Sequence, residues 1–556
     1  MSGTQGSQTG AESRAWIGVD VGTGSVRAGV FGSTGTMLAS AKTDIALHRG
    51  PGLSVEQSSA EIWAAVCGSV RTALQRSSVA PESVGGLGFD ATCSLVVLGR
   101  DGASLPVGAS GDPRRDVIVW MDHRAVDQAE RINATHHPVL KYVGGVISPE
   151  METPKLLWLR ENRPEVFDAA WQFFDLTDFL TWRATGSLER SACTVTCKWT
   201  YLSHEKRWDP SYFRAIGLDV LADENFARIG AEIVAPGTPL GKGLSAAAAA
   251  ELGLEAGTPV GAGLIDAHAG GVGTVGATGA GGDPTACMAY VFGTSSCTMT
   301  TTREPAYVPG VWGPYYSAMV PGLWLNEGGQ SAAGAAIDRL LALHPARAEA
   351  AGQAAAKGLP LASWLARKAA SQAPTLSDAV RLAVEVHVVP EFLGNRAPFA
   401  DPHARAVIAG LGMEDSLEGL VALYVAGICG IGYGLRQIVE IQAAHGATIE
   451  RIVISGGAGQ EDIVRQLLAD ATGIPVVATH SNEPVLLGAA MLGAVAGGGF
   501  AALHEAMAAM SSAKAVYEAA AGGIRRLHEA RYAAFQTLQQ AAREARRLVN
   551  SSVETA

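Results

Sequence analysis

Two segments of this 556-residue chain repeat one pattern, in which an apolar strand meets a second strand through a turn of glycine and hydroxyl residues. The first spans 16–40, WIGVDVGTGSVRAGVFGSTGTMLAS, and the second spans 288–302, MAYVFGTSSCTMTTT. In the first, apolar residues at 17, 19 and 21 alternate with small or polar ones, which is the period of a half-buried strand. The repeat, about half a chain apart, predicts a duplicated domain.

Both turns have the composition of a phosphate-binding loop, because glycine lets backbone N–H groups approach an anion and hydroxyl side chains add donors. The candidate phosphate-binding residues are Gly22, Thr23, Ser25 and Arg27 in the first hairpin and Gly293, Thr294 and Ser295 in the second. Asp20 leaves the first strand beside its turn, where a carboxylate can bind Mg²⁺ directly or through water. The alternative is an ordinary glycine-rich hairpin with one exposed aspartate, since short glycine motifs often match by chance.

With both hairpins, the chain resembles an FGGY-type carbohydrate kinase from about Ala15 to Gly499. The resemblance implies an α/β fold of two actin-like, ribonuclease-H-like ATPase domains with an active-site cleft between them, and ATP and Mg²⁺ as cofactors. It divides the chain into a flexible tail at 1–14, an N-terminal domain at 15–275 that holds the sugar and the first phosphate site, a C-terminal domain at 276–500 that holds the nucleotide, and a helical extension at 501–556.

Composition limits the partners. A net charge of −11 and a pI near 5.7 argue against nucleic acid, whose phosphates favour basic surfaces. The seven cysteines form no CxxC pair and no His/Cys cluster at zinc spacing, which predicts free thiols in a reducing compartment. The small, polar N-terminus lacks the apolar region of a secretory signal, and so we expect a cytoplasmic protein.

Two uncharged runs, at 419–435 and 485–503, approach the length of a membrane span. Both are rich in glycine and alanine, and three consecutive glycines at 497–499 would break a helix. We therefore expect buried helices and no membrane contact. The charged amphipathic helix predicted at 523–550 is either a cap or an oligomer contact, which leaves a homodimer open.

The candidate catalytic residue is Asp266, which ends an apolar, glycine-rich strand at 260–265 and begins a tightly packed helix. A carboxylate at a strand end that opens on the cleft is placed to accept a proton from an attacking hydroxyl. The resemblance makes Asp266 the catalytic base and a candidate metal ligand. His268 is a second candidate base, for which a structural role is preferred.

Cys93, Lys198 and Glu327 are expected to join Asp266 in contacting the sugar. Lys198 lies between a cysteine and a tryptophan, and from this position alone an ion pair with a nearby acid is the simpler interpretation. The resemblance instead places Lys198 and Glu327 at ribulokinase positions that contact substrate, with Glu327 in a loop before a helix at 331–340. Cys93 lies in a polar break at 90–94, which is otherwise a buried turn with a structural cysteine.

Gly334 and Gly457 complete the nucleotide site that the resemblance implies. Asp338 and Glu461 stand where relatives carry other residues, and so their contact with nucleotide stays open. A Gly-Asn-Arg-x-Pro loop within 390–411 resembles a family loop that packs against the nucleotide domain.

These features predict ATP-dependent phosphorylation of a ketopentose. The stretch TCSLV at 92–96 resembles the signature of the family's D-ribulokinases, and the expected reaction converts D-ribulose to D-ribulose 5-phosphate. L-ribulose or another pentulose or pentitol is the alternative substrate. An actin- or chaperone-like ATPase without sugar chemistry is the alternative from another class, and a catalytically dead sugar-binding scaffold is a third.

Overall fold

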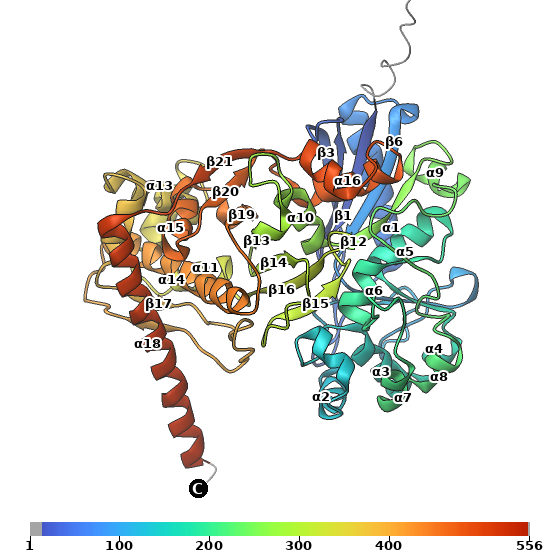
Figure 1. Cartoon of the computed structure of the whole chain (residues 1–556), viewed down its shortest axis with the longest axis horizontal. Coiled ribbons are helices and arrows are strands. Elements are labelled where there is room, and N and C mark those ends of the chain that lie inside the picture. Colours follow the sequence, from blue (N-terminus) through green and yellow to red (C-terminus); the bar gives the residue numbers. More distant parts are fainter. Residues whose placement is uncertain (1–13, 554–556) are drawn as a thin grey trace, which may run out of the picture.

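The computed structural model describes residues 14–553, so residues 1–13 of the predicted tail lie outside the described part. The chain forms two α/β lobes that lie side by side (Figure 1). The sheet of the first lobe has the order β12-β6-β1-β2-β3. Its strands are β1 (Ala15–Val21), β2 (Ser25–Phe31), β3 (Met37–Asp44), β6 (Val84–Ala91) and β12 (Val260–Ile265).

The sheet of the second lobe repeats this arrangement inside the order β15-β16-β14-β13-β19-β20-β21. Its strands are β13 (Cys287–Phe292), β14 (Ser296–Thr302), β15 (Trp312–Tyr316), β16 (Trp324–Gln330), β19 (Arg451–Ser455), β20 (Val476–Thr479) and β21 (Ala513–Tyr517). In each sheet the hairpin is antiparallel, and its first strand pairs in parallel with the next central strand. The duplication predicted from the two turns is therefore confirmed.

The first lobe also contains a smaller sheet with the order β4-β5-β8-β7-β9. Its strands are β4 (His48–Arg49), β5 (Val55–Gln57), β7 (Leu95–Leu98), β8 (Val117–Ile118) and β9 (Gln172–Asp175). The helices of this lobe include α1 (Ser59–Ser77), α3 (Glu152–Asn162), α5 (Leu176–Thr185), α6 (Ala192–Trp199) and α10 (Asp266–Val275). The 92–96 stretch runs into β7 of this sheet and α6 contacts β12, so both lie beside the end of the main sheet where the site forms.

Helix α1 shows how local sequence sets an element's bounds. Its apolar face recurs at helical spacing, and Ile62, Val66, Val70 and Leu74 are all buried. The helix begins at Ser59 because 55–57 pair as a strand and the side chain of Ser58 accepts a hydrogen bond from the N–H of Glu61. A serine N-cap of this kind satisfies an otherwise unpaired amide.

Helix α16 (Pro484–Ala496) packs against the sheet of the first lobe, although it follows the second-lobe strands in sequence. The contact requires glycine, since a Cβ atom at Gly18 would lie 2.0 Å from the carbonyl oxygen of Leu486 and one at Gly88 would lie 2.0 Å from that of Ala489. On the other side, α16 packs on α10, where a Cβ atom at Gly488 would lie 1.9 Å from the carbonyl oxygen of Ala269. Backbone-to-backbone packing therefore holds α16 between the first sheet and α10, and α10 in turn packs on β13 of the second lobe.

The long helix α14 (Leu417–Ala444) contains the first uncharged run. It is long and apolar enough to span a membrane, but 72% of an apolar 18-residue segment within it is buried inside the protein. Core helices can be equally long and apolar. Helix α16, which covers much of the second run, is also largely buried. Both runs thus form buried helices, as predicted.

The region after 500 contributes to the second lobe. Strand β21 pairs with β20, and α18 (Gly522–Val553) packs its first half on α14 before it projects from the molecule (Figure 1). Tyr532 and Phe535 are buried, and Arg531 donates to the carbonyl oxygen of Val386 at 2.9 Å. The start of α18 is therefore a cap on the second lobe.

His528 makes the α18 contact sensitive to pH. The ring is buried, its Nδ1 lies 3.0 Å from the hydroxyl oxygen of Tyr433, and burial together with the charges of Arg531 and Arg436 lowers its pKa to about 4. In the unfolded chain this histidine would protonate near pH 6.5, so stability is lost as pH falls from about 6.5 toward 4. The loss from this group at pH 5 is about 2 kcal/mol.

We expect His528→Gln to reduce the difference in urea stability between pH 7.5 and pH 5 by about that amount. His403→Gln, which changes an exposed histidine, is the control. A variant at 528 with the full pH dependence of the parent would contradict this account.

Candidate active site

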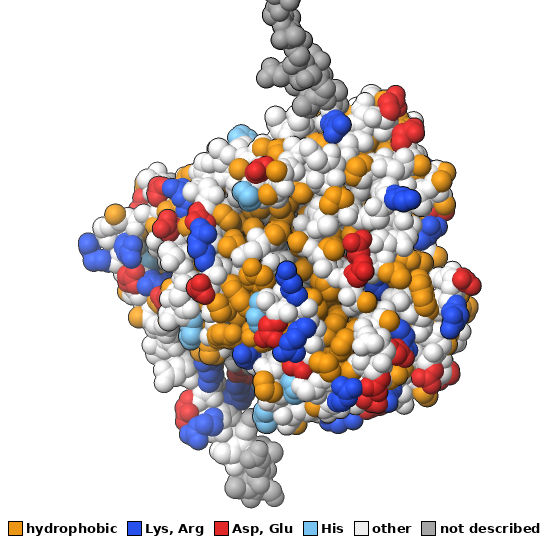
Figure 2. Space-filling model, turned by 45° about the vertical axis from the view of Figure 1, so that its right-hand side comes forward, with side chains coloured by type: hydrophobic (Ala, Val, Ile, Leu, Met, Phe, Trp, Pro, Cys, Tyr) orange, Lys and Arg blue, Asp and Glu red, His pale blue; other side chains and the backbone are white. Residues whose placement is uncertain are grey.

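A cavity of about 270 Å³ lies between the two lobes. Its walls come from the ends of β1, β6 and β12, from α6, and from β13 to β16 of the second lobe. Among the predicted site residues, the cavity brings together Asp20, Gly22, Thr23, Arg27, Cys93, Lys198, Asp266, Ser295 and Glu327. On the face shown in Figure 2, hydrophobic side chains gather across the middle of the molecule, with charged groups among and around them.

Three carboxyl groups meet at the ends of neighbouring strands. Asp20 of β1 stands opposite Asp90 of β6, and Asp266 follows β12 on the other side of β6. Burial, assisted by the charge of Asp20, raises the pKa of Asp266 to about 7. Burial also raises the pKa of Asp90, whose two carboxyl oxygens have no hydrogen-bond partner among residues 14–553. This set of oxygen donors is of the kind that Mg²⁺ prefers.

Arg27 has partners that its sequence position did not reveal. It forms an ion pair with Asp20, its neighbour across the β1–β2 ladder, and its Nη1 lies 2.7 Å from Oε2 of Glu483 just before α16. Burial is the largest influence on Asp20 and raises its pKa, while Arg27 opposes that rise. The positive charge of Arg27 therefore balances the negative charges of Asp20 and Glu483. Its contact with phosphate stays a prediction.

Lys198 and Glu327 form a buried pair, with Nζ and Oε2 3.8 Å apart. Although burial opposes ionisation, Lys198 and a hydrogen bond from His268 lower the pKa of Glu327 to about 2. The ammonium group also lies 4.5 Å from the ring centroid of Trp312. The ion pair expected from the sequence alone is thus present, and its two members line the cavity.

The expectation that Glu327 lies in a loop was wrong. It lies within β16, opposite Met299 of β14 and Trp312 of β15. The polar, glycine-containing sequence NEGGQ conceals the strand, because pairing on both edges rather than local propensity holds it extended.

His268 is fully buried on α10 and does not line the cavity. Its Nδ1 lies 3.1 Å from Sγ of Cys193, and its Nε2 lies 3.4 Å from Oε2 of Glu327. These contacts fit the structural role that was preferred for it. Burial opposes its protonation, but Cys193 and Glu327 raise its pKa to about 9.

Cys193 and Cys197 also meet at this histidine, each on α6 and each fully buried. The sequence contains no His/Cys cluster at zinc spacing, but the fold brings these three donors within 4.8 Å of one another. The two cysteines are one helical turn apart, but His268 comes from about 70 residues further along the chain, and only the fold reveals the group. All seven cysteines are free thiols, as predicted.

Three residues that line the cavity were not predicted from the sequence to do so: Glu150, Trp312 and Arg396. Arg396 belongs to the Gly-Asn-Arg-x-Pro loop, which was expected only to pack against the nucleotide domain; its guanidinium lies 5.9 Å from the ring centroid of Trp312. The loop motif was a usable signal for Arg396. No local signal distinguishes Trp312 from an ordinary core tryptophan.

The remaining predicted nucleotide residues assemble outside the cavity. The N–H of Gly334, at the start of α11 (Gly334–Leu341), donates to the carbonyl oxygen of Gly293 at 2.9 Å, and the N–H of Ala333 donates to that of Thr294 at 2.9 Å. Gly457 follows β19, and the space where its Cβ would lie is open for 4 Å. Ser25, Gly293, Thr294, Gly334 and Gly457 do not line the cavity.

For Asp338 and Glu461 the sequence did not decide whether they contact nucleotide. Asp338 is exposed on α11, and Glu461 pairs with Arg367 at 3.2 Å. Neither lines the cavity.

Comparisons with known proteins place this geometry in a family. Residues 15–273 match the N-terminal domain of the FGGY family of carbohydrate kinases, and residues 288–497 match its C-terminal domain. The chain is 44% identical over 509 residues to a human FGGY carbohydrate kinase domain-containing protein, covering 90% of this chain and 91% of that one. It is 37% identical over 519 residues to a D-ribulokinase of Saccharomyces cerevisiae, covering 87% of this chain and 72% of that one.

Solved structures confirm the two-domain, actin-like fold. A xylulose kinase from Rhodospirillum rubrum superposes with a TM-score of 0.78 at 21% identity, covering 96% of this chain and 99% of that one. A glycerol kinase from Plasmodium falciparum with ADP superposes with a TM-score of 0.72 at 16% identity, covering 95% of this chain and 98% of that one. The chain therefore belongs to the FGGY family of carbohydrate kinases.

Proposed function

We propose that this carbohydrate kinase transfers the γ-phosphoryl group of ATP to the terminal hydroxyl group of D-ribulose and forms D-ribulose 5-phosphate. The observation that carries the proposal is the convergence of Asp266, Lys198 and Glu327 on one cavity. A carboxyl group with a pKa near neutrality stands there close to a buried donor–acceptor pair. This combination suits a small polyhydroxylated substrate that must lose a proton as it reacts.

In this proposal Asp266 accepts the proton of the attacking hydroxyl group. The oxygen–phosphorus bond to the sugar forms while the bond to the leaving ADP oxygen breaks. Lys198 donates to sugar hydroxyl oxygens and Glu327 accepts from sugar hydroxyl groups. Cys93, fixed between β6 and β7, forms part of the wall that a substrate of different stereochemistry would meet.

Mg²⁺–ATP supplies the transferred group and charge neutralisation at the phosphates. Asp20 and Asp266, with the oxygens of Asp90 between them, are suited to hold Mg²⁺ directly or through water. The first turn (Gly22, Thr23, Ser25) and the second (Gly293, Thr294, Ser295) would face the phosphates, with Arg27 beside the first. Gly334 and Gly457 would contact the adenosine, for which Gly457 leaves open space.

The choice of D-ribulose rests on two observations. The TCSLV stretch at 92–96 ends in β7, and Thr92 and Cys93 line the cavity. The D-ribulokinase of Saccharomyces cerevisiae is 37% identical to this chain, whereas ribulokinases of Shouchella clausii and Mycolicibacterium smegmatis are 28% and 30% identical over about 450 residues. L-ribulose and other pentuloses or pentitols are the competing substrates. We place the enzyme in the cytoplasm, in keeping with its free thiols.

The test compares catalytic efficiency for D-ribulose, L-ribulose, D-xylulose, ribitol and glycerol under saturating Mg²⁺–ATP. D-ribulose should exceed the next best substrate by at least about tenfold, because a wrong epimer leaves buried polar groups unpaired. Higher efficiency with any other substrate would refute the D-ribulose assignment.

An ATP-only control tests the rival classes. An actin- or chaperone-like ATPase would release ADP at the same rate without sugar, and a dead scaffold would release none with any sugar. The polar groups of the cavity favour the kinase, since a partner-driven ATPase has no use for a buried Lys198–Glu327 pair beside Asp266.

A further inference from the structure

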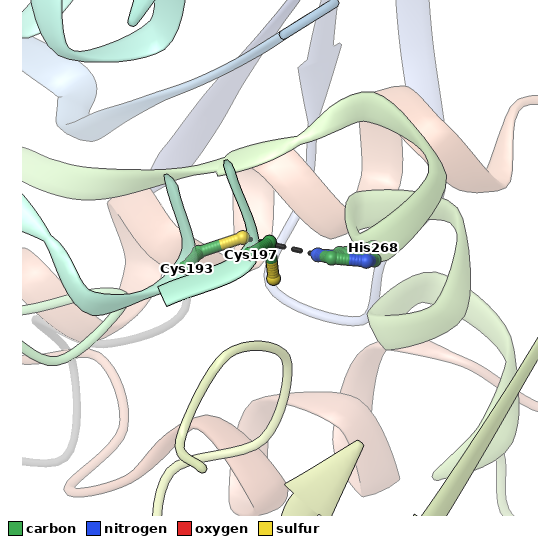
Figure 3. A group of neighbouring side chains, drawn as sticks. All are labelled: Cys193, Cys197 and His268. Carbon is green, nitrogen blue, oxygen red and sulfur yellow. Dashed lines mark hydrogen bonds between the residues drawn. The ribbon is translucent and has the colours of Figure 1, made fainter. Parts of the chain in front are cut away.

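We propose that Cys193, Cys197 and His268 bind one thiophilic divalent cation of the Zn²⁺ class, at a site separate from that of Mg²⁺–ATP. The three side chains leave α6 and α10 and meet in the interior, and the ring of His268 turns one nitrogen toward the cysteines (Figure 3). Two sulfurs and one imidazole nitrogen are a common donor set for Zn²⁺, whereas Mg²⁺ prefers oxygen.

The spacing of the donor atoms fits such an ion. One ligand atom from each residue lies within 4.8 Å of the others, and Cys193 Sγ is 3.1 Å from His268 Nδ1. With ordinary Zn–S and Zn–N bond lengths, tetrahedral ligands lie about 3.5–3.8 Å apart. Shifts of up to about 1 Å in side-chain position would therefore complete the coordination, and three protein ligands leave a fourth position free.

Charge balance explains how a buried site can accept the ion. All three residues have at most 1% of their surface exposed, and a lone thiolate or cation there would carry a large desolvation cost. Two thiolates and one divalent cation sum to zero. The N–H of Ile265 also donates to Cys193 Sγ at 3.4 Å, which supports a sulfur that acts as an acceptor.

The second ring nitrogen of His268 contacts a carboxylate, as is usual for a metal-binding histidine. While Nδ1 faces the sulfurs, Nε2 lies 3.4 Å from Oε2 of Glu327. Metal-binding histidines commonly donate their other N–H to a carboxylate, which fixes the tautomer and the ring orientation. A bound ion would thus hold Glu327, and with it Lys198, from behind the cavity wall. This last consequence rests on the proposed sugar site, whereas the metal site itself does not.

The test uses the full-length chain. After treatment with a chelator and a thiol reductant, the protein is titrated anaerobically with Co²⁺, and thiolate-to-cobalt charge-transfer absorption is followed. We expect saturation at one Co²⁺ per chain and loss of the signal when one equivalent of Zn²⁺ is added. Inductively coupled plasma mass spectrometry of protein purified without chelator should find zinc.

Variants locate the site. Cys193→Ser/Cys197→Ser should abolish the charge-transfer band, while Cys67→Ala and Cys429→Ala, which change buried thiols on α1 and α14, should retain it. If the double variant does not fold, the titration of the parent chain still decides: a folded protein with no thiolate–cobalt band refutes the proposal. A band that survives in a folded double variant also refutes it. Because no readout depends on turnover, failure here would leave the kinase assignment intact.

Discussion

Asp266→Asn is expected to lower turnover by about 10²–10⁴-fold, the usual contribution of a positioned general base. The substitution preserves size and leaves an oxygen that can accept the 2.7 Å hydrogen bond from the N–H of Ala267. It removes the ability to take the proton and one carboxylate beside the proposed Mg²⁺ position, where Asp20 and Asp90 remain as oxygen donors. Because the asparagine is uncharged and the wild-type carboxyl group already sits in a buried environment, we expect the fold and the affinity for ATP to persist.

The measurement is steady-state turnover with D-ribulose, together with calorimetric titration of ATP. Asp44→Asn changes an exposed carboxylate on β3 and serves as the control, with parent-like kinetics expected. Near-normal turnover of Asp266→Asn with intact ATP binding would remove Asp266 from the role of base.

Lys198→Met is expected to lower catalytic efficiency for the sugar by about 10²–10³-fold, the scale on which truncating one member of a buried, hydrogen-bonded charge pair acts. The methionine fills much of the same space but leaves Glu327 with His268 as its remaining partner. We expect the Michaelis constant for sugar to rise, while that for ATP stays within about threefold, since Lys198 lines the cavity and the predicted adenosine residues Gly334 and Gly457 do not.

A matched control is available in the same lobe. Lys155 and Glu152 form another fully buried pair, 3.3 Å apart on α3, and neither lines the cavity. Breaking a buried pair costs about 3–5 kcal/mol of stability at either place. Lys155→Met should therefore lower the melting temperature without raising the Michaelis constant for sugar. Equal kinetic losses in the two variants would mean that Lys198 acts through stability alone.

The elements that the sequence predicted well are those whose signals are local. The alternation at 17–21 and the glycine turn after it determine a hairpin, and strand β12 ends where its apolar run meets Asp266. Such patterns can be interpreted from residues that are adjacent in the sequence. The resemblance then linked the two hairpins into one site.

The features that escaped prediction depend on contacts between distant segments. Glu327 is in a strand because β14 and β15 pair with it, and Arg396 reaches the cavity wall near Trp312 from a loop 84 residues further along. The meeting of α6 with His268 has the same origin. No window of sequence contains both partners of these contacts, so only the three-dimensional fold can reveal them.

The packing of α16 on the first sheet has a consequence for biosynthesis. Residues 15–265 provide every strand of that sheet, but the helix that covers Gly18, Gly86 and Gly88 begins only at Pro484. A ribosome adds about 5–20 residues per second. One face of the sheet therefore remains uncovered for tens of seconds until α16 has been synthesised. During that interval the nascent chain exposes apolar strands, and we expect it to engage chaperones until its last hundred residues emerge. The two lobes are thus completed together, near the end of translation, rather than one after the other.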